Sequence, residues 1–182
     1  MNDDDGPHLI ELKLRDVNQL FNSMDPSPFF EKDLDRDADE FIVSWAREYP
    51  LDAPVKLRVH LERWPEQDPA ALIESAVHAH FAARAKMTDL EFRRLMRTGR
   101  LSLLIGLLFL GACLTATRAL LRYPSVWSGY LREGLTIAGW VGMWRPMEIY
   151  LYDWWPLRRR GRNFSRLAEM PVEVVRGEPP ST

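Results

Sequence analysis

The longest apolar stretch of the chain lies between residues 101 and 117. It reads LSLLIGLLFLGACLTAT, holds 17 residues without a charged side chain, and is flanked by Arg100 and Arg118. A helix needs about 20 mostly apolar residues to cross the roughly 30 Å hydrocarbon core of a bilayer, and about 17 is the lower limit. The pattern therefore predicts a transmembrane helix over residues 101–121.

A second apolar segment lies between residues 134 and 155. Its first eleven residues are uncharged, and Arg145, Pro146 and Glu148 follow before the aromatic stretch IYLYDWW. Eleven helical residues rise only about 16 Å, so that part alone is too short to span a membrane. Two interpretations are open: a full span that contains a charged pair, or a re-entrant or interfacial helix kinked at Pro146.

Aromatic and basic residues favour a helical hairpin with a short periplasmic loop over residues 122–133. Tyrosine and tryptophan lie at both ends of the second segment, as they do at the two headgroup levels of a span. Bases precede the first segment and follow the second, and the positive-inside rule then places both termini in the cytoplasm. The arginines expected to contact anionic lipid headgroups are Arg97, Arg100, Arg158, Arg159, Arg160 and Arg162.

Small residues predict where the two membrane helices pack. Helix backbones approach closely in lipid where small residues recur every four positions. The positions that fit this spacing are Gly111 with Thr115 and Ala112 with Ala116 on the first helix, and Gly134, Ala138 and Gly142 on the second. The spacing leaves open whether the partner is the other helix of the hairpin or a second copy of the chain.

Residues 8–86 carry the patterns of a small cytoplasmic α/β domain. Apolar and polar residues alternate over 8–14 and 55–61, which predicts two half-buried strands. Helical patterns lie over 16–24 and 33–49, and a third helix is expected to follow Asp68 and Pro69. The predicted order is β-α-α-β-α. Two strands rarely form a stable sheet alone, so we expect packing by the three helices and sheet completion by a second copy. The short apolar run at residues 172–175 offers an edge strand as another way to complete the sheet.

Two further features of the domain are predicted from local patterns. Thr88 and Glu91 have the spacing of a capping box, which predicts a new amphipathic juxtamembrane helix over 88–100. The helix over 33–49 is expected to bury one apolar face, formed by Leu34, Ala38, Phe41, Ile42 and Trp45. The fold class is thus α+β, with a small α/β domain followed by a transmembrane helical hairpin.

Charge is distributed unevenly along the 182 residues. The net charge is only −2, yet residues 1–50 carry thirteen acids against five bases, and residues 84–166 carry fifteen bases against five acids. A basic region around apolar segments indicates anionic lipid as the partner and not nucleic acid. The acidic residues 1–7 are expected to be disordered, and residues 156–182 to form a basic cytoplasmic tail.

No pattern typical of an enzyme or a metal site is present in the sequence. The acidic series over 33–40 fails as a calcium loop, because Ala38 and Ser44 stand where such a loop needs glycine and glutamate. His78 and His80 are two residues apart and project in different directions from a helix. The single cysteine lies in the first apolar stretch, so no disulfide framework exists. We therefore expect no catalytic residues, no cofactor and no metal.

The strongest candidate site is the polar group Arg145, Glu148 and Asp153 in the second apolar segment. An ionisable residue at the centre of a membrane helix costs about 2.5–3.5 kcal/mol on insertion scales, so it usually faces a partner or a water-filled cavity. One interpretation is a self-neutralised pair of Arg145 and Glu148, three residues apart. The other is an ion or proton path, or a polar contact that locks an oligomer.

Two stretches resemble an uncharacterised family of small bacterial membrane proteins. They are LFNSMDPSPFFEKDLDRDADEFI, at residues 20–42, and MWRPMEIYLYDWWPLRRR, at residues 143–160. The resemblance covers residues 8–175 and implies an acidic α/β head, a two-helix hairpin and a location in the bacterial inner membrane. It implies no activity, so no functional residues are transferred from it.

These observations predict an integral membrane protein that acts non-enzymatically as an anchor, adaptor or assembly subunit. Its cytoplasmic domain is expected to bind a soluble protein partner, and the chain to form a homo-oligomer or join a membrane complex. The alternative is a subunit of an oligomeric ion or proton channel or transporter that uses Arg145 and Glu148. A membrane-tethered enzyme is a third interpretation.

Overall fold

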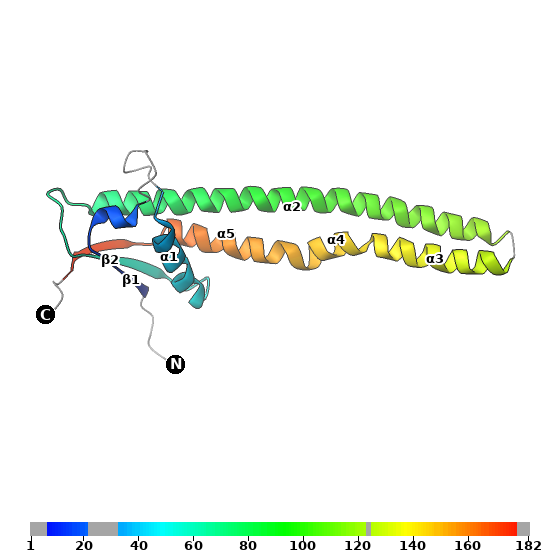
Figure 1. The fold of residues 1–182 in the computed structure, drawn as a ribbon, viewed down its shortest axis with the longest axis horizontal. Helices are drawn as coiled ribbons and strands as arrows, with labels where there is room; N and C mark the ends of the chain where they lie inside the picture. Colours follow the sequence, from blue (N-terminus) through cyan, green and yellow to red (C-terminus); the bar gives the residue numbers. More distant parts are fainter. Residues whose placement is uncertain (1–6, 22–32, 123–124, 178–182) are drawn as a thin grey trace. The chain divides into compact units, whose positions relative to one another are not determined.

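The structure is a computed structural model that describes residues 7–21, 33–122 and 125–177. The chain is mostly helical, with a small three-stranded parallel sheet and one long apolar helix (Figure 1). It divides into two compact units, one formed by Met1–Met87 with Arg160–Thr182 and the other by Thr88–Arg159. The acidic N-terminal residues 1–6 and residues 22–24 of the predicted first helix lie outside the described residues.

The sheet of the first unit has the order β1-β2-β3, with all neighbours parallel. Strands β1 (His8–Leu14) and β2 (Val55–Leu61) have the bounds that the alternating pattern predicts. Strand β3 (Val172–Arg176) comes from the end of the chain and pairs with β2. The predicted edge strand is therefore confirmed, and the chain supplies the third strand itself. The basic tail expected over 156–182 is in fact helix and strand up to Arg176.

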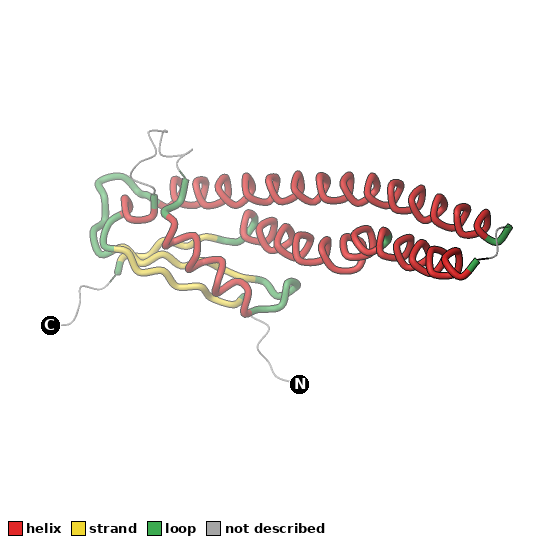
Figure 2. Tube along the Cα trace, turned by 45° about the vertical axis from the view of Figure 1, so that its right-hand side comes forward, coloured by secondary structure: helices red, strands yellow, loops and turns green. Residues whose placement is uncertain are grey.

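Short polar side chains fix where the helices of this unit begin. Asp16 accepts a hydrogen bond from the Asn18 amide at the start of the 3₁₀ helix η1 (Val17–Leu20). Asp35 accepts a hydrogen bond from the Asp37 amide at the start of α1 (Arg36–Glu48). Asp68 accepts one from the Ala70 amide at the start of α2 (Ala70–Leu120). Such caps satisfy amides that have no partner within the helix. Figure 2 shows α1 lying along the layer of strands.

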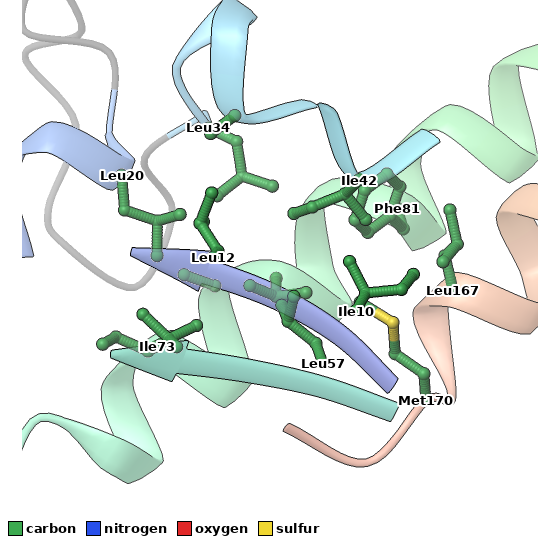
Figure 3. Close-up of a cluster of buried hydrophobic side chains, with 14 of the residues drawn as sticks. Ile10, Leu12, Leu20, Leu34, Ile42, Leu57, Ile73, Phe81, Leu167 and Met170 are labelled. Atoms are coloured by element: carbon green, nitrogen blue, oxygen red, sulfur yellow. The ribbon is translucent and has the colours of Figure 1, made fainter. Parts of the chain in front are cut away.

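One face of the sheet forms the hydrophobic core of this unit. Figure 3 shows Ile10 and Leu12 of β1 and Leu57 of β2 in one cluster with side chains from α1, α2 and the end of the chain. The helical side chains in this cluster include Ile42, Ile73, Phe81 and Leu167, and Met170 joins them after α5 (Trp154–Ala168). The alternation along β1 and β2 thus directs every second side chain into one core.

The buried face of α1 differs from the predicted one. Ala38, Ile42, Val43 and Ala46 are buried, whereas Phe41 and Trp45 are 37% and 40% exposed. The helix turns by about 100° per residue, so a face centred on Ile42 leaves positions 41 and 45 on its flank. The two aromatic side chains therefore lie beside the core and not within it, which corrects the predicted face.

The other face of the sheet is polar and joined by ion pairs across the strands. Arg58 of β2 lies opposite Glu11 of β1 and Glu173 of β3 in the register. Its guanidinium contacts Glu173 at 2.9 Å and Glu11 at 3.7 Å, and Lys56 also pairs with Glu173 at 2.9 Å. Hydrogen bonds from Lys56 and Arg58 lower the pKa of Glu173 below its ordinary value. This face is solvated and makes no core.

Helix α2 has no break where a new juxtamembrane helix was expected. It continues through residues 86–91, and Thr88 is buried inside it with 5% exposure. A capping box starts a helix only if the preceding residue leaves the helical conformation. Residues 70–98 contain neither glycine nor proline and are rich in alanine, so the helix has no local reason to stop.

The second unit is a hairpin of helices. The second part of α2 lies antiparallel to α3 (Val126–Gly142), α4 (Trp144–Glu148) and a π-helical turn, η2 (Ile149–Asp153). Helix α3 begins within the stretch 122–133, which was expected to be a loop. The interruption falls at Met143, whereas Pro146 lies in the first turn of α4, where its missing N–H is tolerated.

Candidate functional site

The outer surface of the hairpin is apolar. Helix α2 is the one helix of the described residues that is long and apolar enough to cross a membrane, and only 11% of its most apolar 18-residue stretch is buried. The exposed side chains of this stretch include Leu101, Leu104, Ile105, Leu107, Leu108 and Leu114. Helix α3 also exposes Val126, Trp127, Leu131, Ile137, Trp140 and Val141. A core helix of a water-soluble protein would bury such residues.

The hairpin has two arms, the second part of α2 and the segment formed by α3, α4 and η2. Small residues seven positions apart on α2 allow the two arms to approach closely. A Cβ on Gly99 would lie 2.8 Å from Cγ2 of Ile149, and a Cβ on Gly106 would lie 3.0 Å from the carbonyl oxygen of Gly142. Cys113 continues this series and lies 3.2 Å from the corresponding position on Gly139. A seven-residue repeat keeps one stripe of a helix facing an antiparallel neighbour.

The predicted packing residues only partly coincide with this contact. Gly142 lies in it, with 2.7 Å between its Cβ position and Cδ1 of Phe109. A Cβ on Gly111 or Gly134 would meet nothing within 4 Å, and the Thr115 hydroxyl bonds to the carbonyl of Ala112 in its own helix. The four-residue spacing thus missed Gly99 and Gly106, which the seven-residue spacing of small residues would have found.

Arg145 lies between the two carboxylates of the candidate polar group. Its Nη1 atom is 3.1 Å from Oε2 of Glu148 and 3.4 Å from Oδ2 of Asp153. The indole Nε1 of Trp144 donates to the other oxygen of Glu148 at 3.1 Å. The side chains of Arg145, Glu148 and Asp153 are 61%, 42% and 36% exposed, so this group faces away from the hairpin contact.

The π-helical turn explains how Asp153 reaches Arg145. In a regular α-helix, eight residues at about 100° each would place Asp153 roughly 80° away from Arg145 around the axis. The wider turn η2, with hydrogen bonds to the fifth residue, takes up this rotation. Residue spacing in a regular α-helix therefore predicted the ion pair between Arg145 and Glu148. It did not predict the contact between Arg145 and Asp153.

The six arginines expected at lipid headgroups are all exposed, unlike their neighbour Arg166. The Arg166 guanidinium donates to the backbone carbonyls of Ala46, Pro50 and Ala53 and to Oδ1 of Asn163 at 2.8 Å. Burial lowers the pKa of Arg166, and the charge of Asp52 opposes this shift. Arg166 thus joins α5 to the end of α1 and belongs to the domain, although it follows a basic stretch.

His80, which the sequence analysis excluded as half of a metal-binding pair with His78, joins elements of the domain. His80 contacts Asp39 of α1 through Nε2 at 3.2 Å and Asp33 through Nδ1 at 3.3 Å, and Arg84 also pairs with Asp39. Burial raises the pKa of Asp39, but the hydrogen bonds from His80 and Arg84 outweigh it and the pKa falls below its ordinary value. Among the described residues, no group could hold a metal ion.

A groove of about 500 Å³ lies beside the open edge of β1. It is lined by Leu9, Glu11, Leu12 and Lys13 of the strand and by the exposed rings of Phe41 and Trp45 on α1. A second groove, of about 400 Å³, lies around Trp64 and is lined largely by the residues that start η1 and α2. The first groove combines a strand edge that no other described strand covers with two aromatic side chains, which is typical of protein-binding surfaces.

Comparisons with known proteins do not assign this chain to a family. No protein-family model matches it. Neither a curated protein nor a solved structure matches it. The resemblance of two stretches to small bacterial membrane proteins therefore stays a prediction.

Proposed function

We propose that this chain is an integral membrane protein whose helical hairpin anchors a small α/β domain, and that it acts non-enzymatically as an anchor, adaptor or assembly subunit. The observation that carries the proposal is the uncovered apolar surface of α2, of which only 11% is buried over 18 residues. In water such a surface would drive aggregation, whereas in lipid it needs no protein partner.

The second arm completes the span. The 17 residues of α3 alone rise about 25 Å, and α4 with η2 extends this arm further. The close approach of the arms at Gly106 and Gly139 is the kind of contact that stabilises helix pairs in lipid. The distribution of bases favours both termini in the cytoplasm, and the membrane is proposed to be a bacterial inner membrane.

The adaptor role is supported by the structural contacts that the polar residues of the α/β domain make. Asp16, Asp35 and Asp68 cap helices, and His80 joins α1 to α2. These acids and histidines are engaged in structural contacts, whereas the groove beside β1 leaves apolar and aromatic surface uncovered. A domain with this distribution of contacts is suited to binding another protein surface.

Extraction of membranes tests the anchor directly. The full chain should stay in the pellet after an alkaline carbonate wash and enter solution only with detergent. Replacing both Leu107 and Leu108 with arginine should release it or lead to its degradation, because each buried charge costs about 2.5–3.5 kcal/mol on insertion scales. Isoleucine at the same two positions is the matched control. Recovery of the unaltered chain in the detergent-free wash would contradict the proposal.

Reporter fusions test the topology. A reporter that reads the cytoplasmic side should be active when fused at Asn2 and when fused at Thr182. A fusion in the connection near Ser125 should read the opposite side. Opposite results for the two termini would mean that the second arm does not span, and would leave a re-entrant or interfacial helix.

A channel subunit is the second candidate, and the position of the polar group favours it. Arg145, Glu148 and Asp153 face away from the hairpin contact and carry two negative charges against one positive charge. In lipid such a group needs a partner helix or water. Proteoliposomes that hold the full chain should then pass protons or ions, and Glu148→Gln should abolish the flux with assembly intact. Absence of flux in the unaltered protein would reject this candidate.

A further inference from the structure

Among the residues that the structure describes, strand β1 has one edge whose backbone groups pair with no other strand. The His8 amide donates to the Pro54 carbonyl at 2.8 Å, beside β2. Backbone groups of successive strand residues point to alternate sides, so those of Leu9, Glu11 and Lys13 point away from β2. Within the described residues no strand pairs with this edge. The edge can therefore accept one more strand without any rearrangement of the sheet.

Apolar surface accompanies this edge. The groove beside β1 is lined by Leu12 and by the rings of Phe41 and Trp45, which are 37% and 40% exposed. A strand added to β1 would carry its own side chains into this groove. An isologous partner would also bring a second pair of aromatic rings to the same place, since a two-fold axis repeats every contact.

The charges of β1 are complementary to those of an antiparallel copy of β1. With a two-fold axis at Leu12, Glu11 lies opposite Lys13 of the second copy, and Lys13 lies opposite Glu11 of the second copy. Shifting the register by two residues places Glu11 opposite Glu11, or Lys13 opposite Lys13, and like charges directly opposite are destabilising. A shift by one residue turns the apolar face outward.

We propose that two copies of this chain associate through antiparallel pairing of their β1 strands about a two-fold axis at Leu12. The result is a continuous six-stranded sheet, made of the three strands of each copy. Glu11 and Lys13 are both in the set of residues whose backbone groups point outward, so this register also aligns amides with carbonyls. A lysine on an edge strand, such as Lys13, normally discourages that edge from pairing with another strand. In the proposed dimer, Glu11 of the second copy neutralises the charge of Lys13.

Charge exchange between two variants tests the pairing in the full chain in detergent. Lys13→Glu places glutamates opposite Glu11 in its own dimer, and Glu11→Lys places lysines opposite Lys13. Each variant alone should dimerise on the order of tenfold more weakly than the unaltered chain. Mixed together, the two variants should form a heterodimer, because both of its pairs are of opposite charge. Sedimentation measures the masses, and two affinity tags identify the mixed species.

A disulfide on the proposed axis tests the register separately. With Cys113 replaced by alanine, Leu12→Cys should give a covalent dimer on mild oxidation, since residues directly opposite have Cβ atoms about 4.5–5.5 Å apart. Leu14→Cys is the matched control and should not cross-link, because it lies two residues away from the axis.

Several outcomes would overturn the proposal. They are a single-chain mass at all concentrations, dimerisation of both charge variants as strong as that of the unaltered chain, or equal cross-linking at Leu12 and Leu14. A dimer that the β1 substitutions leave unchanged would place association in the hairpin instead. Because the carbonate extraction does not depend on β1, failure here leaves the proposed anchor role standing.

Discussion

The carbonyl oxygen of Gly142 lies 3.0 Å from the position that a Cβ would take on Gly106. Pro146 has no N–H to donate to this carbonyl, although it stands four residues later in the same arm. The backbone of α2 therefore approaches the point where the hydrogen-bond ladder of the other arm is interrupted. Glycine at 106 is what permits this approach, and weak Cα–H···O contacts are common at such places.

Substitution of Gly106 by leucine should destabilise the hairpin. The new side chain has no room against Gly142 and Pro146, and overpacking costs about 1–3 kcal/mol. The midpoint of thermal unfolding in detergent should fall, and protease cleavage between the arms should become faster. Gly111→Leu is the control on the same helix, because a Cβ there meets nothing within 4 Å. Equal effects of the two substitutions would show that the close approach contributes nothing.

Replacing Arg166 with methionine should destabilise the α/β domain by about 2–3 kcal/mol. The guanidinium donates to three backbone carbonyls at the end of α1 and in the following turn, and a hydrogen bond to a charged group is worth about 1.5–3 kcal/mol. Hydrogen exchange of the amides of α1 is the direct measurement. Arg162→Met is the matched exposed control and should leave the exchange rates unchanged.

The domain should lose stability in acid through Asp39. Its pKa in the folded chain lies below its ordinary value of 3.8, so ionised Asp39 stabilises the fold above that value. This contribution is lost as the pH falls below about 4 and through the lower folded pKa. Unfolding midpoints measured from pH 6 to pH 3 should fall more steeply for the unaltered chain than for Asp39→Asn. Asp37→Asn, exposed on the same helix, should keep the unaltered slope.

Arg145 should matter more for membrane insertion than either carboxylate. Arg145→Gln leaves Glu148 and Asp153 without their shared cation, whereas Glu148→Gln or Asp153→Asn leaves one ion pair intact. An unpaired charge within the membrane is costly. The amount of carbonate-resistant protein should therefore fall most for Arg145→Gln, and Arg158→Gln should behave as the unaltered chain. A larger loss for Glu148→Gln would instead favour a partner helix that depends on this carboxylate.

The sequence patterns predicted the strands and helix starts that depend only on residues close together in the sequence. The alternation over 8–14 and 55–61 predicted the two strands with their observed bounds, and Asp68 begins its helix as the capping preference predicts. The short valine run of β3 predicts a strand from its own residues. Its position beside β2 depends on a return of the chain after more than a hundred residues, and the pattern could offer it only as one of two ways to complete the sheet.

The features that sequence reasoning missed depend on geometry between elements. Phe41 and Trp45 fit an apolar helix face, but the helix packs against the core through the side centred on Ile42. The hairpin contact follows a seven-residue repeat of small side chains, whereas the prediction counted in fours. The contact between Arg145 and Asp153 requires a π-helical turn, for which residue spacing in an α-helix gives no indication.

The return of β3 to the sheet also sets an order of events during synthesis. A nascent chain that ends at residue 86 has β1 and β2 but lacks Phe164, Leu167 and Met170 of the core and the strand that borders β2. At about 5–20 residues per second, the ribosome needs on the order of ten seconds to reach residue 172. Both arms of the hairpin emerge in this interval. The first half of the domain therefore stays incomplete until residues 164–176 have been made, and a chain truncated within the hairpin would expose an incomplete fold to proteases.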